Sequence, residues 1–390
     1  MDIALRYGCN PNQQPAQIQM PQGDTPLRVV NGAASFINIL DALRGWQLVR
    51  ELAQTTGKPA AASYKHVSPA GAAVAGPLSE VFCAGHLIDD GPNLSPIASA
   101  YAKARSSDRS ASFGDFVALS QPADASLARL LKPEVSDGII APGYEPEALE
   151  IIRAKKGGNY LMLEIDPGYE PPEMEDRLEF GMRLSQKRND QPIGPELLGN
   201  VVTKNKAFSP EAIETLLVAT VTLKHTQSNS VALGYAGQAV GIGAGQQSRI
   251  ACTRLACTKA EAWLLKTHPR TLELPFRPGL KRAEKVNIID QYVRWDELGP
   301  FEREQISAGL TADPQPISAA ERADYLAGFD HLACSSDAFF PFRDNIDRLA
   351  RTGVRAVLQA GGSKRDEDVV AAADEHGMTM AMSGVRFFLH

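Results

Sequence analysis

Long hydrophobic runs are missing from this sequence of 390 residues, and no apolar stretch approaches the roughly 18 residues that a membrane-spanning helix needs. A basic excess is missing as well, because 46 acidic residues outweigh 40 Lys and Arg residues. Proteins that coat nucleic acid usually carry the opposite balance. The sequence therefore predicts neither membrane insertion nor nucleic-acid coating, although a local basic pocket for a single phosphate stays open.

Cysteine is scarce, with 5 residues scattered along the chain. Because the N-terminus does not resemble a signal peptide, these thiols are expected to be reduced and the protein cytoplasmic. No His is followed two residues later by Glu, and Cys252 and Cys257 fit no zinc-binding spacing. A G-x-S-x-G nucleophile motif is also missing. These absences argue against zinc chemistry and against that type of hydrolase.

What is present is typical of a soluble globular protein, with 44% apolar and 22% charged residues. Helical patterns alternate with short apolar runs, and this alternation predicts an α/β fold. A stretch rich in Pro, Gly and charge at 166–195 suggests a linker between two α/β units, with the division placed between 1–180 and 181–390. Predicted strands lie at 59–67, 117–119, 136–142, 160–165, 230–235 and 239–243, and predicted helices at 36–46, 69–74, 95–116, 145–156, 213–224 and 246–268.

Lys65 and His66 are the most suggestive pair of side chains. An apolar run leads into them, and Ser68 followed by Pro69 favours a helix start, with Ser as N-cap and Pro as first helical residue. This interpretation places an ammonium and an imidazole at the carboxyl end of a strand, above a helix N-terminus. Such a pair suits proton transfer, because His titrates near neutrality and a partly buried Lys is readily tuned. The alternative is a solvated Lys beside a structural His.

Other stretches also allow two interpretations. Arg6 and Tyr7 lie in a turn-rich segment where they could hold a phosphate or simply face solvent. The glycines of 241–245 suit either a ligand loop or a tight turn. The polar run 224–230 suggests the lining of a site, because burying so many polar groups without partners is costly. The aromatic cluster 339–342 suits either a stacked heterocycle or core packing.

Taken together, these motifs occur in one order along the whole chain. The series is Arg6-Tyr7-Gly8-x-Asn10-Pro11, Asn31-Gly32-Ala33, Lys65-His66-Val67-Ser68-Pro69-Ala70-Gly71, Ser136-Asp137-Gly138-Ile139-Ile140-Ala141-Pro142-Gly143, Thr226-Gln227-Ser228-Asn229-Ser230, Gly241-Ile242-Gly243-Ala244-Gly245-Gln246-Gln247-Ser248-Arg249 and Ser336-Asp337-Ala338-Phe339-Phe340-Pro341-Phe342-Arg343-Asp344. The series resembles the transformylase domain of the bifunctional purine enzyme AICAR transformylase/IMP cyclohydrolase.

The resemblance implies two cytidine-deaminase-like three-layer αβα subdomains that lack the zinc site. It also implies a homodimer with shared active sites. The implied reaction transfers a formyl group from 10-formyltetrahydrofolate to AICAR (aminoimidazole carboxamide ribonucleotide), a step of purine biosynthesis that gives FAICAR and tetrahydrofolate. A catalytically silent nucleotide- or folate-binding paralogue, and a different acyl or amidino transferase, are the alternatives.

The resemblance also implies roles for individual residues. Lys65, His66 and Asn229 would be catalytic. The residues that would bind AICAR are Arg6, Tyr7, Gly114, Asp137, Asn229 and Arg249. Those that would contact the folate are Phe339, Asp344, Ser363, Lys364 and Arg386. A monovalent cation such as K+ is a further expectation, near Asp337.

Three departures from the family pattern accompany the resemblance. The chain starts at the transformylase motif, so we expect no cyclohydrolase domain and no ring closure to IMP. Asn12 stands where the family commonly has His, and His225 where it commonly has Tyr. Both residues lie beside site motifs, so nucleotide affinity or the pH profile is expected to differ.

Overall fold

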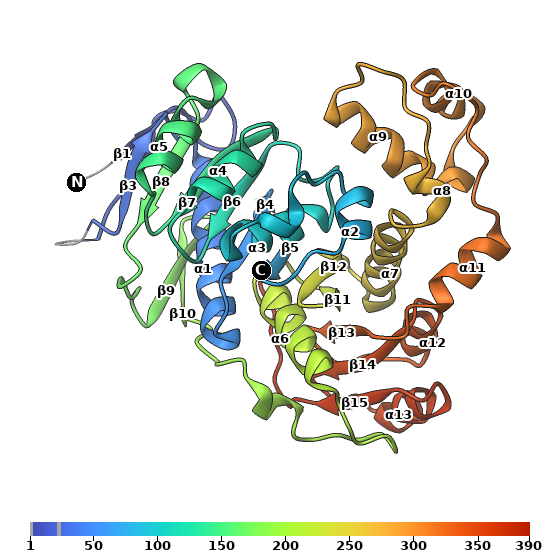
Figure 1. Ribbon diagram of the computed structural model, residues 1–390. Coiled ribbons are helices and arrows are strands. Elements are labelled where there is room, and N and C mark those ends of the chain that lie inside the picture. Colours follow the sequence, from blue (N-terminus) through green and yellow to red (C-terminus); the bar gives the residue numbers. More distant parts are fainter. Residues whose placement is uncertain (1–2, 22–24) are drawn as a thin grey trace.

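Most strands of the chain join one mixed sheet (Figure 1). A computed structural model describes residues 3–21 and 25–390, and its 11-stranded sheet has the order β15-β14-β13-β11-β12-β5-β4-β6-β7-β8-β3. Two short hairpins, β1–β2 and β9–β10, form separate two-stranded sheets. The fold is therefore α/β, as the sequence predicted.

The sheet contains the same succession of elements twice. The first half comprises α1 (Phe36–Thr56), β4 (Ala60–Lys65), β5 (Ser68–Val74), α3 (Pro96–Ser106), β6 (Asp115–Leu119), α4 (Ala125–Leu131), β7 (Ser136–Ala141), α5 (Pro146–Arg153) and β8 (Leu161–Ile165). The second half comprises α6 (Pro210–Lys224), β11 (Val231–Tyr235), β12 (Gln238–Gly243), α7 (Arg249–Leu265), β13 (Leu332–Ser336), α12 (Asp344–Arg351), β14 (Val354–Gln359), α13 (Asp366–Glu375) and β15 (Thr379–Met382).

The strand directions repeat as well. In each half the first strand lies between the second and third and is antiparallel to both, while the third, fourth and fifth strands are parallel. The halves meet where β5 pairs with β12 in antiparallel fashion, at Ala73 and Gln238. The two halves therefore share one topology, which is the result that duplication of a single α/β unit would give.

Helices cover both faces of the sheet (Figure 1). On one face α1 and α6 pack together, and one hydrophobic core runs beneath them from β8 to β15. On the other face α3, α4 and α5 cover the first half, while α7, α12 and α13 cover the second half. The arrangement has three layers, helix on sheet on helix.

Further elements lie around this framework. They are β1 (Ile3–Leu5), β2 (Ala16–Ile18), β3 (Leu27–Asn31), α2 (Glu80–Gly85), β9 (Met174–Glu179), β10 (Met182–Lys187), α8 (Pro269–Leu272), α9 (Arg282–Tyr292), α10 (Pro300–Ala308) and α11 (Ala319–Ala327), with 3-10 helices at Gly91–Asn93, Lys155–Gly158, Pro195–Leu198 and Trp295–Glu297. The segment 166–195, predicted to be a linker, thus contains the β9–β10 hairpin. The predicted boundary between 1–180 and 181–390 falls in the turn of this hairpin, at Gly181. No helix in the described ranges 3–21 and 25–390 is long and apolar enough to cross a membrane.

The prediction that a helix starts at Pro69 is wrong. Residues Ser68–Val74 form strand β5 instead, antiparallel to β4. A Cβ on Gly71 would lie 2.1 Å from the carbonyl oxygen of Ala104, so β5 packs directly on the backbone of α3. Pro69 is tolerated because it lies beside a register shift in the β4–β5 pairing, at Ser63 and Tyr64. Packing against α3 has overridden the local helix-start signal.

Candidate active site

Lys65 and His66 lie at the turn between β4 and β5. Lys65 ends β4 and is half-buried, and its ammonium donates a hydrogen bond to the carbonyl oxygen of Phe113. His66 is exposed, and it forms a two-residue turn with Val67. The pair therefore presents a fixed ammonium next to an imidazole that solvent and ligands can reach.

The amino ends of β6 and β7 lie beside this turn, because both strands run opposite to β4. They bring Gly114 and Asp137 to the same edge. Gly114 has a φ of +73°, and its Cβ position is 3.6 Å from Asp137 Oδ2. The carboxylate of Asp137 is exposed and pairs with the Lys156 ammonium at 2.8 Å. Lys65, Gly114 and Asp137 thus come from three neighbouring strands.

Arg6 and Tyr7 lie beside the start of α1. The Arg6 N–H donates to the Ala34 carbonyl oxygen at 3.3 Å, and the Phe36 N–H donates to the Tyr7 carbonyl oxygen at 3.4 Å. Since α1 runs antiparallel to β4, its N-terminus lies at the edge that carries Lys65. The structure thus brings Arg6, Tyr7, Lys65, His66, Gly114 and Asp137 to one region, here called the N-terminal group.

Asn229 and Arg249 belong to a second region. Arg249 donates from Nη2 to Asn229 Oδ1 at 2.9 Å and from Nη1 to the Ser230 carbonyl oxygen at 2.8 Å, and it forms an ion pair with the buried carboxylate of Asp337. The peptide bond between Ser228 and Asn229 is cis. Asn229, Arg249 and Asp337 are here called the C-terminal group.

The carboxylate of Asp337 is surrounded by donors. Besides Arg249, it accepts from Ser228 Oγ at 2.7 Å, from the Ser230 N–H at 2.8 Å and from Ser230 Oγ at 2.9 Å. Oxygen atoms that already face this many donors are poor ligands for K+, and the guanidinium would repel the cation. These contacts do not favour Asp337 itself as a cation ligand. In residues 3–21 and 25–390 no cluster of His, Cys, Asp and Glu side chains fits a metal ion.

The residues expected to contact the folate follow the carboxyl ends of β13 and β14 or lie in the C-terminal tail, at the sheet edge that carries the C-terminal group. Phe339 follows Asp337 closely and is 41% exposed, whereas Phe340 is buried in the core. The Phe339 ring is therefore available for stacking, and the Phe340 ring serves core packing. Asp344 begins α12, and Ser363 and Lys364 follow the carboxyl end of β14. The exposed Arg386 stacks its guanidinium on the Phe388 ring, 4.6 Å from its centroid, in a C-terminal tail that bonds back to Ser228 and Asp337.

Both groups face the same edge of the sheet. The carboxyl end of β4 and the amino end of β11 point the same way, because β5 and β12 between them are antiparallel to each other. With strands spaced by about 4.8 Å, β4 and β11 are separated by roughly 14 Å. No hydrogen bond or ion pair joins the two groups in the described part of the chain.

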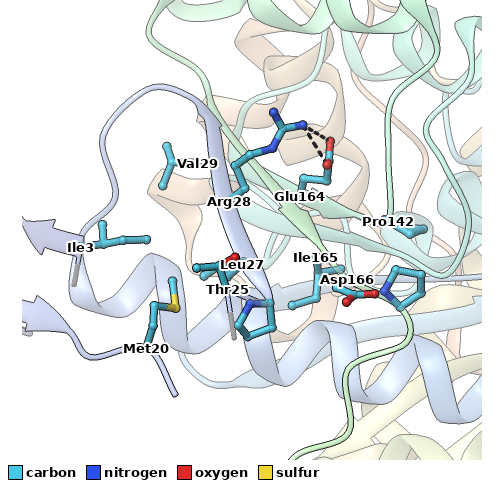
Figure 2. Close-up of a pocket in the computed structure, with 12 residues that line it drawn as sticks. Ile3, Met20, Thr25, Leu27, Arg28, Val29, Pro142, Glu164, Ile165 and Asp166 are labelled. Carbon is cyan, nitrogen blue, oxygen red and sulfur yellow. Dashed lines mark hydrogen bonds and ion pairs between the residues drawn. The ribbon is translucent and has the colours of Figure 1, made fainter. Parts of the chain in front are cut away.

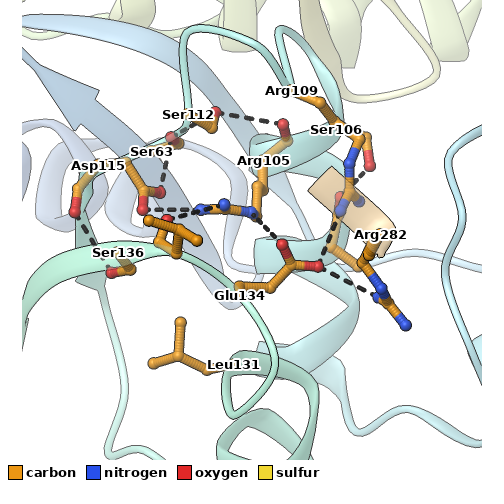
Figure 3. A network of polar contacts seen from close by, with 12 residues as sticks. Ser63, Arg105, Ser106, Arg109, Ser112, Asp115, Leu131, Glu134, Ser136 and Arg282 are labelled. Carbon is orange, nitrogen blue, oxygen red and sulfur yellow. Dashed lines mark hydrogen bonds and ion pairs between the residues drawn. The ribbon is translucent and has the colours of Figure 1, made fainter. Parts of the chain in front are cut away.

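A buried ionic network lies beneath the N-terminal group (Figure 3). Arg105 of α3 pairs with Asp115 at 2.7 Å and with Glu134 at 3.2 Å, and Glu134 also pairs with Arg109 at 2.8 Å and with Arg282 at 3.2 Å. Burial alone would raise the pKa of Glu134, but Arg109 and Arg105 outweigh burial and hold the pKa below its ordinary value. Asp115 directly follows Gly114, so the network fixes the segment that carries this residue.

The network also reaches the start of β7. Ser136 Oγ donates to the Asp115 carbonyl oxygen at 3.3 Å and lies 2.6 Å from the Tyr160 hydroxyl. Arg105 Nη2 donates to the Val135 carbonyl oxygen at 3.0 Å. These contacts position the residues immediately before Asp137. Sequence patterns could not have found them, because their members come from α3, β6, β7 and loops far apart in the chain.

Two cavities lie away from the predicted residues. One of about 700 Å³ lies beside β3 and β8, where Arg28 and Glu164 pair at 2.8 Å, and no predicted site residue lines it (Figure 2). Another, of about 390 Å³, lies between α1 and α6 and contains His225, whose Nε2 is 2.8 Å from Glu51. His225, one of the noted departures, thus pairs with α1 rather than facing either group.

The fold and the site define a class of protein: an α/β protein built from two like halves on one sheet, with cationic, amide and carboxylate side chains gathered along one sheet edge. A family model described as "AICARFT/IMPCHase bienzyme" matches residues 2–259. The chain belongs to this family.

Curated relatives agree with this assignment. The "Bifunctional purine biosynthesis protein PurH" of Magnetococcus marinus is 32% identical over 393 residues, covering 99% of this chain and 59% of the relative. The protein of the same name from Roseobacter denitrificans is 31% identical over 392 residues, again covering 99% of this chain and 59% of the relative. The chain therefore spans well under two thirds of the length of these relatives, and the matched part includes both groups.

Proposed function

We propose that this protein is an AICAR formyltransferase. It transfers the formyl group of 10-formyltetrahydrofolate to the 5-amino group of AICAR, and the products are FAICAR and tetrahydrofolate. The observation that carries the proposal is the N-terminal group, in which a fixed ammonium, an accessible imidazole and a carboxylate lie together on neighbouring strands of a protein of this family.

AICAR is proposed to bind between the groups. The Arg6 guanidinium suits the phosphate, which is recognised by charge and by the planar donor fork. Tyr7, Gly114 and Asp137 complete one side of the nucleotide site, with Asn229 and Arg249 on the other. The folate is proposed to contact Phe339, Asp344, Ser363, Lys364 and Arg386, where an exposed aromatic ring is available for stacking.

The proposed reaction is an acyl transfer between two nitrogen atoms. The amine of AICAR is a poor nucleophile, because its lone pair is delocalised into the ring and the carboxamide. His66 takes the amine proton as the new C–N bond forms. Lys65 supplies a proton to N10 of the folate as the old C–N bond breaks. Asn229 and Lys65 donate to the oxyanion of the tetrahedral intermediate, and losing one such donor is expected to cost about 3 kcal/mol of barrier.

The proposal extends to the assembly and fold. Each half is proposed to be a cytidine-deaminase-like αβα subdomain, 1–180 and 181–390, and the protein is proposed to be a homodimer with shared active sites. The separation of the two groups supports sharing. So do the exposed apolar residues of the β9–β10 hairpin, since large exposed apolar side chains often mark interfaces; they are Met174, Leu178, Phe180, Met182 and Leu184.

The test is tetrahydrofolate formation, followed by absorbance, with purified protein, AICAR and 10-formyltetrahydrofolate. Turnover that requires both substrates and yields FAICAR is the expected result. Binding of both substrates without turnover would favour a silent paralogue, and no binding would refute the proposal. The same assay, read for IMP and repeated with K+ replaced by Na+, tests the expectations on ring closure and on the cation.

A further inference from the structure

The turn that carries His66 has an unusual backbone. His66 has a φ of 53° and Val67 a φ of 60°, so both lie in the left-handed region. A β-branched residue is rare there, because its Cβ branches crowd the neighbouring carbonyl groups. Unfavourable backbone geometry of this kind persists only where surrounding contacts enforce it, and it is often associated with functional sites.

The second half of the chain provides an internal comparison. The turn between β11 and β12 occupies the same place in the repeat, and its residues Ala236 and Gly237 have φ values of 48° and 70°. Two-residue hairpin turns with this geometry prefer Gly at their second position, which is where Gly237 lies. The left-handed turn thus belongs to the repeat, while the unfavourable Val is particular to the half that carries the Lys-His pair.

One contact recurs at both turns. Asp41 Oδ1 accepts a hydrogen bond from the Val67 N–H at 2.6 Å, and Thr215 Oγ1 accepts one from the Gly237 N–H at 3.2 Å. Each acceptor is five residues beyond the first residue of its helix, Phe36 in α1 and Pro210 in α6. A carboxylate therefore holds the unfavourable turn, and a hydroxyl holds the relaxed one.

Asp41 is well placed for this role. Its residue is 5% exposed, so solvent does not compete for the hydrogen bond. Burial raises the pKa of Asp41, with His66 and the Val67 N–H acting in the opposite direction and Asp137 in the same direction. An oxygen atom can accept from the Val67 N–H whether or not the carboxyl group is protonated. The side chain thus lies against the backbone of the turn, between members of the N-terminal group.

We propose that Asp41 is a positioning residue: its hydrogen bond to Val67 holds the His66-Val67 turn in its left-handed form, and so fixes Lys65 and His66 relative to Gly114 and Asp137. The inference rests on the proposed formyl transfer, in which Lys65 and His66 act on the substrates. Asp41 itself does not react.

Kinetics of four variants test the proposal. Asp41→Ala should lower kcat by about 100-fold, since small misplacement of reacting groups has effects of this size, with a smaller change in the KM for AICAR. Asp41→Asn keeps an oxygen acceptor and should stay within about tenfold of wild type. Adding Val67→Gly to Asp41→Ala should restore kcat about tenfold, because Gly adopts the turn without help; the single Val67→Gly variant is the reference for this comparison.

A matched control removes the same contact from the other half. Thr215→Ala deletes the hydrogen bond to Gly237 and should leave kcat within about twofold, as it is remote from both groups. Equal loss of kcat in Thr215→Ala and Asp41→Ala would show a merely structural role and overturn the proposal. Wild-type kcat in Asp41→Ala, or no recovery on adding Val67→Gly, would overturn it as well.

A measurement independent of activity separates this inference from the proposed function. Hydrogen exchange of peptides covering residues 60–74 should quicken about tenfold in Asp41→Ala and little in Asp41→Asn, because the Val67 amide loses its acceptor only in the former. An inactive wild-type protein would refute the formyltransferase. Unchanged exchange in Asp41→Ala would refute the positioning role of Asp41, whether or not the protein is active.

Discussion

At the scale of single residues, the exposed imidazole of His66 is the proposed general base. We predict that His66→Ala lowers kcat by about 100-fold or more, as expected for loss of a general base, while AICAR affinity changes little. Steady-state kinetics and a binding titration check this. His331→Ala is the control, because His331 is an exposed His outside both groups, with 82% of its side chain accessible. Unchanged turnover in His66→Ala would exclude His66 as the base.

Gly114 provides a second prediction at this scale. Because Gly114 has a φ of +73°, Gly114→Ala should strain the backbone, and the added methyl group would lie in van der Waals contact with the Asp137 carboxylate, at 3.6 Å. We expect a loss of about 1–2 kcal/mol of stability together with weaker AICAR binding. Gly279→Ala is the matched control, with a φ of +87° and open space around it. Gly279→Ala should lose similar stability but keep its affinity for AICAR. Equal AICAR affinities in the two variants would show that Gly114 is not part of the nucleotide site.

Several site residues could be predicted from the sequence, because each lies in a short, contiguous motif. Lys65, His66 and Asp137 lie in short contiguous stretches, and the structure brings them to one sheet edge. The role of Asp41 could not be predicted from the sequence, because Asp41 lies in a helix whose pattern indicates only core packing. Its role also depends on a backbone N–H 26 positions away, at Val67. Its signal, an Asp buried within an amphipathic helix, is visible only once burial is known.

At the scale of elements, the two turns of the repeat explain one success and one failure. Both strands of the β11–β12 hairpin were predicted, because two apolar runs lie on either side of a break at Gly237. The β4–β5 hairpin was missed because His66 and Val67 are not among the residues that favour such a turn, while Ser68 and Pro69 imitate a helix start. The β9–β10 hairpin and the helices of 270–320 were also missed. These elements are short and rich in charged residues, and the Pro and Gly residues in the segments around them favour loops.

The buried network gives a prediction for the joining of α3, β6, β7 and α9. Glu134→Gln leaves Arg105, Arg109 and Arg282 without their shared carboxylate, and we expect a loss of about 3–5 kcal/mol in the free energy of unfolding. Urea denaturation at neutral pH measures it. Glu147→Gln is the control, because Glu147 pairs with Arg129 on the surface, and the expected loss there is below about 1 kcal/mol.

The pH dependence of that loss has a definite sign. The folded-state pKa of Glu134 lies below its ordinary value of 4.5. A carboxyl group with a lowered folded pKa contributes its full stability above the ordinary value, and the contribution is lost as pH falls through the folded value. The stability difference between wild type and Glu134→Gln should therefore be constant near neutral pH and shrink below pH 4.5. A difference that grew on acidification would contradict the ionic account.

At the scale of the whole molecule, the repeat makes the two halves one body. Their hydrophobic core is continuous beneath α1 and α6, and the sheet passes from one half to the other through β5 and β12. Sequence could suggest two α/β units but could not show that they share one sheet, because the pairing of β5 with β12 depends on residues in opposite halves. The repeat also places the N-terminal group and the C-terminal group at one edge of the sheet, with β5 and β12 between them.

This separation leads to a prediction about assembly. If each active site combines the N-terminal group of one chain with the C-terminal group of a second copy, two different inactive variants should complement each other. In a mixed dimer of His66→Ala and Asn229→Ala, one site carries both lesions and the other carries neither. After equal amounts are unfolded and refolded together, random pairing should restore roughly a quarter of wild-type activity in a two-fold dimer. Refolding each variant alone is the control and should restore none. Activity that stays at the level of the separate variants would mean that each chain completes its own site, and the proposed sharing would be wrong.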